Sequence, residues 1–158
     1  MRAGVQVRAG EVGDLEAIVA LERAAAEAPH WAAASYAGVV CGGEAEAVQR
    51  CLFVAEGAAG LVGFAVGAAA GCGELESVVV DVGWRRGGIG RALCAAVVEW
   101  CRGRGADAVE LEVRAGSGGA IALYGELGFV EMGRRRGYYR EPEADAVLMR
   151  LELGSASY

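Results

Sequence analysis

The sequence predicts an α/β domain with a mixed central β-sheet and helices on both faces. Three observations carry this prediction. Strand-like and helix-like stretches follow one another in the order β-α-α-β-β-β-α-β-α-β-β, a strand, helix, strand unit spans residues 75–113, and no internal repeat or linker divides the 158 residues. A chain of this length can bury about two-thirds of the surface that it exposes when unfolded. Residues 1–158 are therefore expected to form one domain, in which the 75–113 crossover is parallel and right-handed.

The first fifty residues contain a predicted strand and two predicted helices. Apolar and polar residues alternate over Val5–Arg8, as in a strand with one buried face. Asp14 is placed to cap a helix that runs from Leu15 to about Ala26. A Pro-His pair interrupts the pattern, and a second helix is predicted from Trp31 to about Val40.

The middle of the chain predicts a β-hairpin rather than a membrane span. Leu52–Ala55 and Leu61–Val66 are apolar runs on either side of a glycine-containing turn at residues 57–60. The seventeen residues between Glu56 and Glu74 carry no charge, which is the lower edge of a spanning length. Glycines recur through this stretch, as is typical of the turns of β-hairpins and not of a lipid-facing helix, so no membrane partner is expected. These glycines are Gly60, Gly63, Gly67 and Gly71.

The second half of the chain supplies the remaining elements. They are a strand at Leu75–Asp81, a helix from Ile89 that ends at Gly103 and Gly105, a strand at Val109–Val113, a short helix over Ile121–Leu127 that Gly128 closes, and strands near Phe129–Tyr139 and Ala146–Leu153. In open sheets of this kind, ligands bind beyond the carboxyl ends of the strands. The glycine-rich loop that follows the first of these strands lies at such a place.

Composition excludes several classes of protein. A net charge of −6 and a pI near 4.9 disfavour a nucleic-acid-binding protein, which needs a basic face to neutralise phosphates. The five cysteines are odd in number and contain no Cys-x-x-Cys pair, so neither a disulfide framework nor a metal site is expected. No apolar signal segment follows Met1, and a cytoplasmic location is expected. An acidic chain suits a basic partner, and nothing in the sequence indicates an oligomeric state.

Residues 85–91, Arg-Arg-Gly-Gly-Ile-Gly-Arg, have the layout of a phosphate-binding loop between a strand and a helix. The glycines let the backbone approach a ligand, and the first free N–H groups of the following helix point at an anion. The arginines add positive charge. No Gly-Lys-Ser/Thr follows, and Leu93 stands where a dinucleotide-binding loop has its third Gly or an Ala, so those two loop classes are excluded.

The spacing Arg-x-x-Gly-x-Gly resembles instead the pyrophosphate loop of the GNAT acetyltransferase superfamily. Three further segments resemble its RimI family of ribosomal-protein-alanine N-acetyltransferases: Leu-Glu-Val-Arg at 111–114, the run 120–129, and Arg-Arg-Gly-Tyr-Tyr at 135–139. The resemblance is dense from Leu75 to Leu151 and thin before Cys51. It implies a single-domain GNAT fold and an N-acetyltransferase that uses acetyl-CoA as co-substrate, without a metal.

The resemblance places the catalytic groups on Glu112 and Tyr124. Glu112 would be the general base that takes a proton from the amine, and Tyr124 the general acid that protonates the leaving thiolate. Transfer would be direct, within a ternary complex and without an acyl-cysteine. Ser117 stands where the family usually has Asn, and it offers one donor and two lone pairs to the cofactor. The implied acetyl-CoA contacts are Val78, Val79, Val80, Arg85, Arg86, Gly87, Gly88, Ile89, Gly90, Arg91 and Ser117.

From the residues alone, other interpretations stay open. Glu112 shares a strand face with another Glu and an Arg, so it could be a solvated or Arg-paired carboxylate. Tyr124 has helical spacing from apolar positions and could be a core residue. Glu74 and Glu76 are competing bases that rank below Glu112, since some members of the superfamily place their glutamate on the preceding strand.

The resemblance also implies the substrate, the N-terminal alanine of a small-subunit ribosomal protein, itself basic. Tyr138 and Tyr139 match the segment that closes over the peptide N-terminus, although an aromatic pair in a final strand fits a core equally well. Trp31 and Tyr36 are expected to line the other side. The alternatives are a GNAT enzyme acting on other protein N-termini, lysines or a small amine, and a non-catalytic acetyl-CoA-binding module.

Overall fold

The computed structural model describes residues 3–25, 36, 39, 48–140 and 143–154. In this part of the chain, seven strands form one sheet in the order β1-β2-β3-β4-β5-β7-β6. The strands are β1 (Gln6–Ala9), β2 (Gln49–Gly57), β3 (Gly60–Ala70), β4 (Cys72–Val80), β5 (Ala108–Arg114), β6 (Val130–Arg140) and β7 (Glu143–Glu152), and the helices are α1 (Leu15–Ala24), α3 (Ile89–Gly103) and α4 (Gly118–Glu126). Short 3-10 turns cover Val12–Asp14 and Val82–Trp84.

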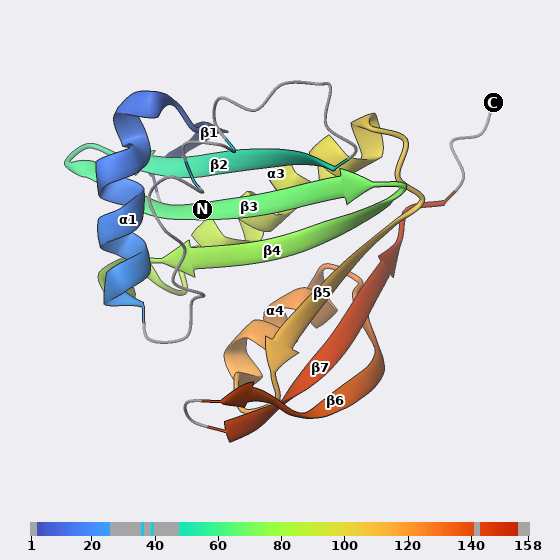
Figure 1. Cartoon of the computed structure of the whole chain (residues 1–158). Coiled ribbons are helices and arrows are strands. Elements are labelled where there is room, and N and C mark those ends of the chain that lie inside the picture. Colours follow the sequence, from blue (N-terminus) through green and yellow to red (C-terminus); the bar gives the residue numbers. More distant parts are fainter. Residues whose placement is uncertain (1–2, 26–35, 37–38, 40–47, 141–142, 155–158) are drawn as a thin grey trace.

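Helices cover both faces of this mixed sheet, as the sequence predicts. Figure 1 shows α1 crossing the near face of the strands and α3 on the far face. The side chains divide in the same way, because one apolar cluster joins the strands to α1 and a larger one joins them to α3, α4 and β5. Ile18 and Phe64 are fully buried in the first cluster, and Leu93 and Val97 in the second. α1 and α3 therefore each bury one apolar stripe against the sheet.

The predicted crossover from β4 through α3 to β5 is parallel, and the other neighbouring strands are antiparallel. The predicted hairpin is formed by β2 and β3, which are longer than the apolar runs that predict them. No helix among the described residues is long and apolar enough to cross a membrane. Of the second predicted helix, Trp31 to about Val40, only Tyr36 and Val39 lie within the described residues, and both are helical.

Two expectations about local structure are wrong. Asp14 stands at the start of α1 but makes no side-chain cap, because its carboxylate accepts hydrogen bonds from Arg8 and from the backbone N–H of Glu11. Gly63 and Gly67 lie inside β3 rather than in a turn. A Cβ at Gly63 would lie 2.8 Å from the Val79 carbonyl oxygen, so close packing of the backbone explains this glycine.

The strands β4 and β5 part soon after they meet, and this splay determines where a ligand can enter the sheet. They pair only at Gly73 with Val109 and at Glu74 with Glu110. Beyond these positions β4 continues with β3, while β5 pairs with β7 along its length, which gives the V-shaped opening in Figure 1. The edge of β4 that faces β5 is consequently without a strand partner from residue 75 to residue 80.

A β-bulge lies at the mouth of this splay. Val66 pairs with Ser77 and Gly67 pairs with Leu75, so Glu76 is an extra residue on β4. An extra residue turns the following side chains to the opposite face of the sheet. Leu75 accordingly belongs to the cluster under α3, whereas Val79 belongs to the cluster under α1.

Candidate active site

The glycine-rich loop of residues 85–91 ends in the first turn of α3. Gly88 is the N-cap, with a left-handed φ of 82°, and Arg86 has a φ of 62°, which non-glycine residues seldom adopt. The first intrahelical hydrogen bond runs from the Ala92 N–H to the Gly88 carbonyl, at 3.0 Å. The N–H groups at residues 89–91 therefore have no intrahelical acceptor and are available to an anion.

A hydrogen bond joins the loop to the end of β4, and the loop lies beside α4. The Arg85 Nε donates a hydrogen bond to the Val80 carbonyl at 3.2 Å. A Cβ at Gly90 would lie 3.4 Å from Leu123 Cδ2 of α4, so the missing side chain allows the two helices to approach closely. Ser117 is the N-cap of α4, and its carbonyl accepts the Ile121 N–H at 3.0 Å. Two of the predicted cofactor-binding segments, the loop and Ser117, thus lie at the starts of neighbouring helices.

Glu112 projects from β5 where the strands have parted. Its side chain is 26% exposed, and its Oε1 lies 3.5 Å from Nη2 of Arg135 in β6. Hydrogen bonding with the same carboxylate raises the pKa of the Tyr138 hydroxyl. Glu112 is therefore an Arg-paired carboxylate, although its partner comes from β6 and not from its own strand.

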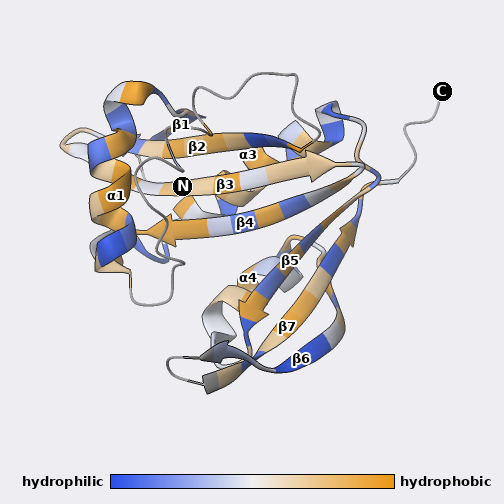
Figure 2. Ribbon diagram, viewed as in Figure 1, coloured by the Kyte–Doolittle hydropathy of each residue, from blue (hydrophilic) through white to orange (hydrophobic). Residues whose placement is uncertain are grey.

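The other candidate bases lie across the splay on β4. Glu76 forms an ion pair with Arg50 of β2 at 2.9 Å. The pKa of Glu74 is raised by partial burial and by the negative charges of Glu76 and Glu112. Figure 2 shows the hydrophilic bands of β4 and β5 near the point where the strands part. The carboxylates of both strands thus act on one another at the entrance of the splay.

Tyr124 and Tyr139 connect this entrance to α4. Tyr124 is half-buried, with its ring edge-on to Phe129 at 5.9 Å between centroids, and burial raises the pKa of its hydroxyl. Tyr139 adds to that shift, and the pKa of Tyr139 is itself raised by burial and by Glu112. Tyr139 is thus within electrostatic reach of Glu112 and of Tyr124. The predicted base in β5 and the predicted acid in α4 are thus linked through their electrostatic interactions with Tyr139 of β6.

Tyr36 does not lie with these residues. It is fully buried in the cluster under α1, where its hydroxyl donates a hydrogen bond to Glu22 and its ring meets Phe64 edge-on at 5.7 Å between centroids. It offers no exposed surface to a peptide, which corrects the expectation that it lines a substrate site. Trp31 lies outside the described residues.

The described cysteines are free, and three of them, Cys51, Cys94 and Cys101, are buried. Burial raises the pKa of Cys51 and Cys94 to about 12 and that of Cys101 to about 11. Thiolates are the reactive form, so these thiols are poor nucleophiles at neutral pH. Among the described residues, no group of His, Cys, Asp and Glu side chains could hold a metal ion.

Two residues of the site were missed as functional candidates. Arg135 contacts Glu112, and the Arg114 guanidinium lies 4.3 Å from the centroid of the Tyr139 ring. Their sequence signals are present, since Arg135 belongs to a basic run next to the two tyrosines and Arg114 ends the Leu-Glu-Val-Arg segment. The resemblance includes Arg135 in the segment that closes over the peptide, but the sequence does not indicate that Arg135 contacts Glu112 or that Arg114 lies over Tyr139.

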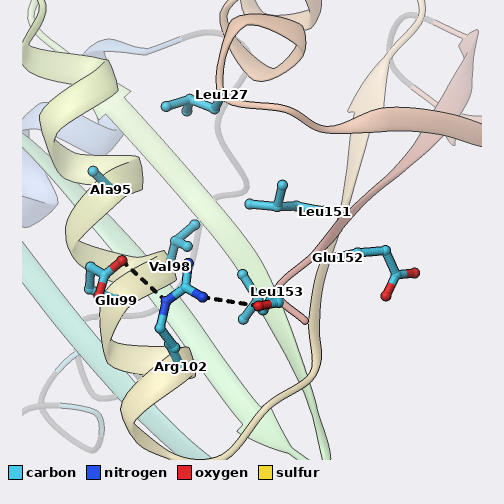
Figure 3. Close-up of a pocket in the computed structure, with 8 residues that line it drawn as sticks. All are labelled: Ala95, Val98, Glu99, Arg102, Leu127, Leu151, Glu152 and Leu153. Atoms are coloured by element: carbon cyan, nitrogen blue, oxygen red, sulfur yellow. Dashed lines mark hydrogen bonds and ion pairs between the residues drawn. The ribbon is translucent and has the colours of Figure 1, made fainter. Parts of the chain in front are cut away.

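A separate pocket lies between the second half of α3 and the end of β7 (Figure 3). Arg102 closes one side, because it donates hydrogen bonds to Glu99 at 3.3 Å and to the Leu153 carbonyl at 3.1 Å. The lining residues are Ala95, Val98, Glu99, Arg102, Leu127, Leu151, Glu152 and Leu153. None of them belongs to the loop or to the Glu112 cluster, so this pocket is distinct from the candidate active site.

Known proteins resemble the chain at both the sequence and the structural level. The N-alpha-acetyltransferase RimI of Mycobacterium tuberculosis is 40% identical over 84 residues, which are 53% of this chain and 51% of that protein. The ribosomal protein bS18-alanine N-acetyltransferase of Escherichia coli K12 is 41% identical over 81 residues, which are 50% of this chain and 55% of that protein. The chain thus spans about half the length of the curated relatives it matches.

The structural likeness extends over nearly the whole chain. The crystal structure of the ribosomal-protein-S18-alanine N-acetyltransferase from Escherichia coli superposes with a TM-score of 0.80 and 30% identity, covering 97% of this chain and 96% of the other. The family model described as "Acetyltransferase (GNAT) family" matches residues 15–129, which include α1, the loop, Glu112 and Tyr124. The chain therefore belongs to the acetyltransferase (GNAT) family.

Proposed function

We propose that this chain is an acetyl-CoA-dependent N-alpha-acetyltransferase that acts on the N-terminal alanine of a small-subunit ribosomal protein. The observation that carries the proposal is that the phosphate-type loop and Glu112 lie at the carboxyl ends of the two strands that part, β4 and β5. Ligands of open α/β sheets bind at such a place. The relatives named above supply the substrate class, since the Escherichia coli enzyme, found both by sequence and by structure, is named for the alanine of ribosomal protein S18.

The residues around the splay fit acetyl-CoA. Its pyrophosphate requires N–H donors and positive charge, which the start of α3 and the arginines of residues 85–91 offer. The edge of β4 that has no strand partner, at Val78–Val80, offers backbone groups to the thioester carbonyl and to the arm that carries it. Ser117 at the start of α4 is the third predicted contact.

The proposed chemistry forms an N–C bond and breaks a C–S bond. The substrate amine loses its proton to Glu112 and attacks the thioester carbonyl carbon, and the sulfur leaves as a thiolate. Tyr124 gives its proton to that sulfur, and its raised pKa keeps the hydroxyl protonated at neutral pH until then. An α-amine has a pKa near 8, so roughly a tenth of it is neutral at pH 7, against well under a thousandth of a lysine amine. Glu112 therefore needs to deprotonate a smaller share of the substrate when the amine is an N-terminus.

Charge supports a basic protein as the partner. The chain has a net charge of −6, and four glutamates surround the entrance of the splay on β4 and β5. Complementary charge raises the encounter rate with a basic substrate. The exposed Tyr138 and the half-buried Tyr139 supply aromatic surface beside Glu112.

The test is mass spectrometry of synthetic peptides incubated with the purified protein and acetyl-CoA. One peptide begins Ala-Arg-Tyr, a second has the same sequence with a blocked N-terminus, and a third carries an internal lysine behind a blocked N-terminus. A single acetyl group on the free alanine alone supports the proposal. Acetylation confined to lysine would assign a different substrate class, and cofactor binding without any acetylation would indicate a non-catalytic acetyl-CoA-binding module.

A further inference from the structure

Glu112 receives two contacts of different kinds from β6. The Arg135 guanidinium lies 3.5 Å from the carboxylate Oε1, and hydrogen bonding with the carboxylate raises the pKa of the Tyr138 hydroxyl. Both partners are exposed, Arg135 at 56% of its side chain and Tyr138 at 47%. They therefore meet the carboxylate at its solvent-facing end.

The strand is irregular at this point, and the irregularity brings both partners to Glu112. Residues 135 and 138 are three apart, so a regular strand would turn their side chains to opposite faces. The register with β7 shifts between Arg135 and Tyr139, and Gly137 has a φ of 59°. The Gly137 N–H donates a hydrogen bond to Asp145 Oδ1 at 3.0 Å, which fixes the bend.

The Arg135 contact is of the kind that another cation can replace. A distance of 3.5 Å between exposed groups is a loose ion pair, and such pairs contribute little because water screens them and long side chains lose freedom. In the same conformation Arg135 also lies over the Tyr138 ring, with 5.5 Å between the guanidinium carbon and the centroid. Moving it away from Glu112 therefore leaves it with a favourable neighbour.

We propose that Arg135 is a displaceable counter-ion of Glu112, whose place on the carboxylate the ammonium group of the substrate takes on binding. This rests on the proposed function, in which Glu112 receives the substrate amine. Arg135 neutralises the carboxylate among the neighbouring glutamates, and a free N-terminus must displace it. Arg135 is therefore a positioning residue that acts through Glu112, and it selects for ligands that bring a positive charge of their own.

The adjacent Arg134 is a matched control. It lies on the same strand with a similar exposed fraction, 54%, and forms its ion pair with Glu131 at 2.9 Å rather than with Glu112. Arg134→Ala removes the same charge and a side chain of the same size. Arg135→Lys keeps the charge and should behave like the wild type.

The experiment measures kcat and KM for the Ala-Arg-Tyr peptide with the wild type, Arg135→Ala, Arg135→Lys and Arg134→Ala. Isothermal titration in the presence of CoA adds the Kd of the same peptide and of its N-acetylated form. For Arg135→Ala we expect KM and Kd of the free peptide to fall by about two- to fivefold, with kcat within about twofold. The acetylated peptide has no ammonium group, so its Kd should stay unchanged in every variant.

An unchanged or raised KM in Arg135→Ala would overturn the counter-ion role. An equal fall in the Kd of the acetylated peptide would overturn it as well, since relief of crowding and not of charge would then be the cause. Failure of the wild type to acetylate the free peptide would instead overturn the proposed function, which distinguishes the two failures.

Discussion

Glu74 in β4 and Glu110 in β5 face one another at the last register pair of the two parallel strands. Glu110 is compensated by Arg150, which lies 3.2 Å away. Glu74 forms no ion pair within the described part of the chain, and the charges of Glu76 and Glu112 act on it together with partial burial to raise its pKa. The entrance of the splay thus holds one carboxylate whose charge is poorly tolerated.

Replacing Glu74 by Gln should stabilise the protein at neutral pH. The pKa of this carboxyl is higher in the folded chain than its usual 4.5, so the wild type loses stability as the pH rises through the interval between the two values. Because the side chain is only partly buried, the gain is limited to about 0.2–1 kcal/mol, or up to about 4 °C in Tm. Thermal unfolding at pH 7 and pH 4 checks this, and a gain that persists undiminished at pH 4 would contradict the electrostatic explanation.

Replacing Glu112 by Gln should lower the acetylation rate by roughly 10²–10⁴-fold, because the amide cannot accept the amine proton. The dissociation constant of acetyl-CoA should stay near that of the wild type. Glu110→Gln is the matched control, since Glu110 lies on the same strand and pairs with Arg150. An unchanged rate in Glu112→Gln would move the base to Glu74 or Glu76.

Replacing Gly88 by Asp should abolish acetyl-CoA binding. The residue has a left-handed φ of 82° and precedes the free N–H groups of α3, so the change adds backbone strain and a negative charge where the pyrophosphate should lie. Gly4→Asp is the control for strain, because Gly4 has the same φ of 82° and nothing within 4 Å of its Cβ position. Calorimetric titration with acetyl-CoA measures both, and retained affinity in Gly88→Asp would remove the loop from the cofactor site.

Replacing Gly67 by Ala should destabilise the fold by about 1–3 kcal/mol, because overpacking strains a filled core. The new Cβ would lie 2.4 Å from Val97 Cγ1 of α3. Adding Val97→Ala should recover part of the loss, and a double-mutant cycle from denaturant unfolding measures the coupling. Gly119→Ala, where the Cβ meets open space in α4, should leave stability unchanged or raise it by up to about 1 kcal/mol. Additive effects of the two core changes would argue against the contact.

Replacing Asp14 by Asn should cost about 1–3 kcal/mol at pH 7, since hydrogen bonds to a charged group are lost. Arg8 binds both oxygens of Asp14, at 2.8 and 2.9 Å, and thereby lowers the pKa of that carboxyl below its usual 3.8. The stabilisation is present above pH 3.8 and disappears as the pH falls through the lowered value, so wild type and variant should converge in strong acid. Glu56→Gln, which breaks a looser 3.3 Å pair with Arg8, should have a smaller effect in the same thermal unfolding experiment.

Local sequence patterns predicted the elements and the loop. Alternation and helical spacing depend on residues a few positions apart, so α3, the β2–β3 hairpin and the parallel crossover could be expected from the chain itself. The resemblance to the GNAT superfamily lay in motifs of the same short range, and the family match agrees with it. The left-handed φ of Gly88 is also a local property, which the glycine in the sequence allows one to expect.

The tertiary structure alone decided which side chains meet. Asp14 stands at the N-cap position of α1, but its side chain binds Arg8 on β1. From the sequence Tyr36 is expected to line the peptide site, but its side chain is buried in the core. Arg135 reaches Glu112 only because β6 is bent beside β7, a bend that depends on a shifted register and on Asp145. Such contacts join residues far apart in the chain. Strand pairing and core packing determine these contacts, and neither can be predicted from the spacing of neighbouring residues.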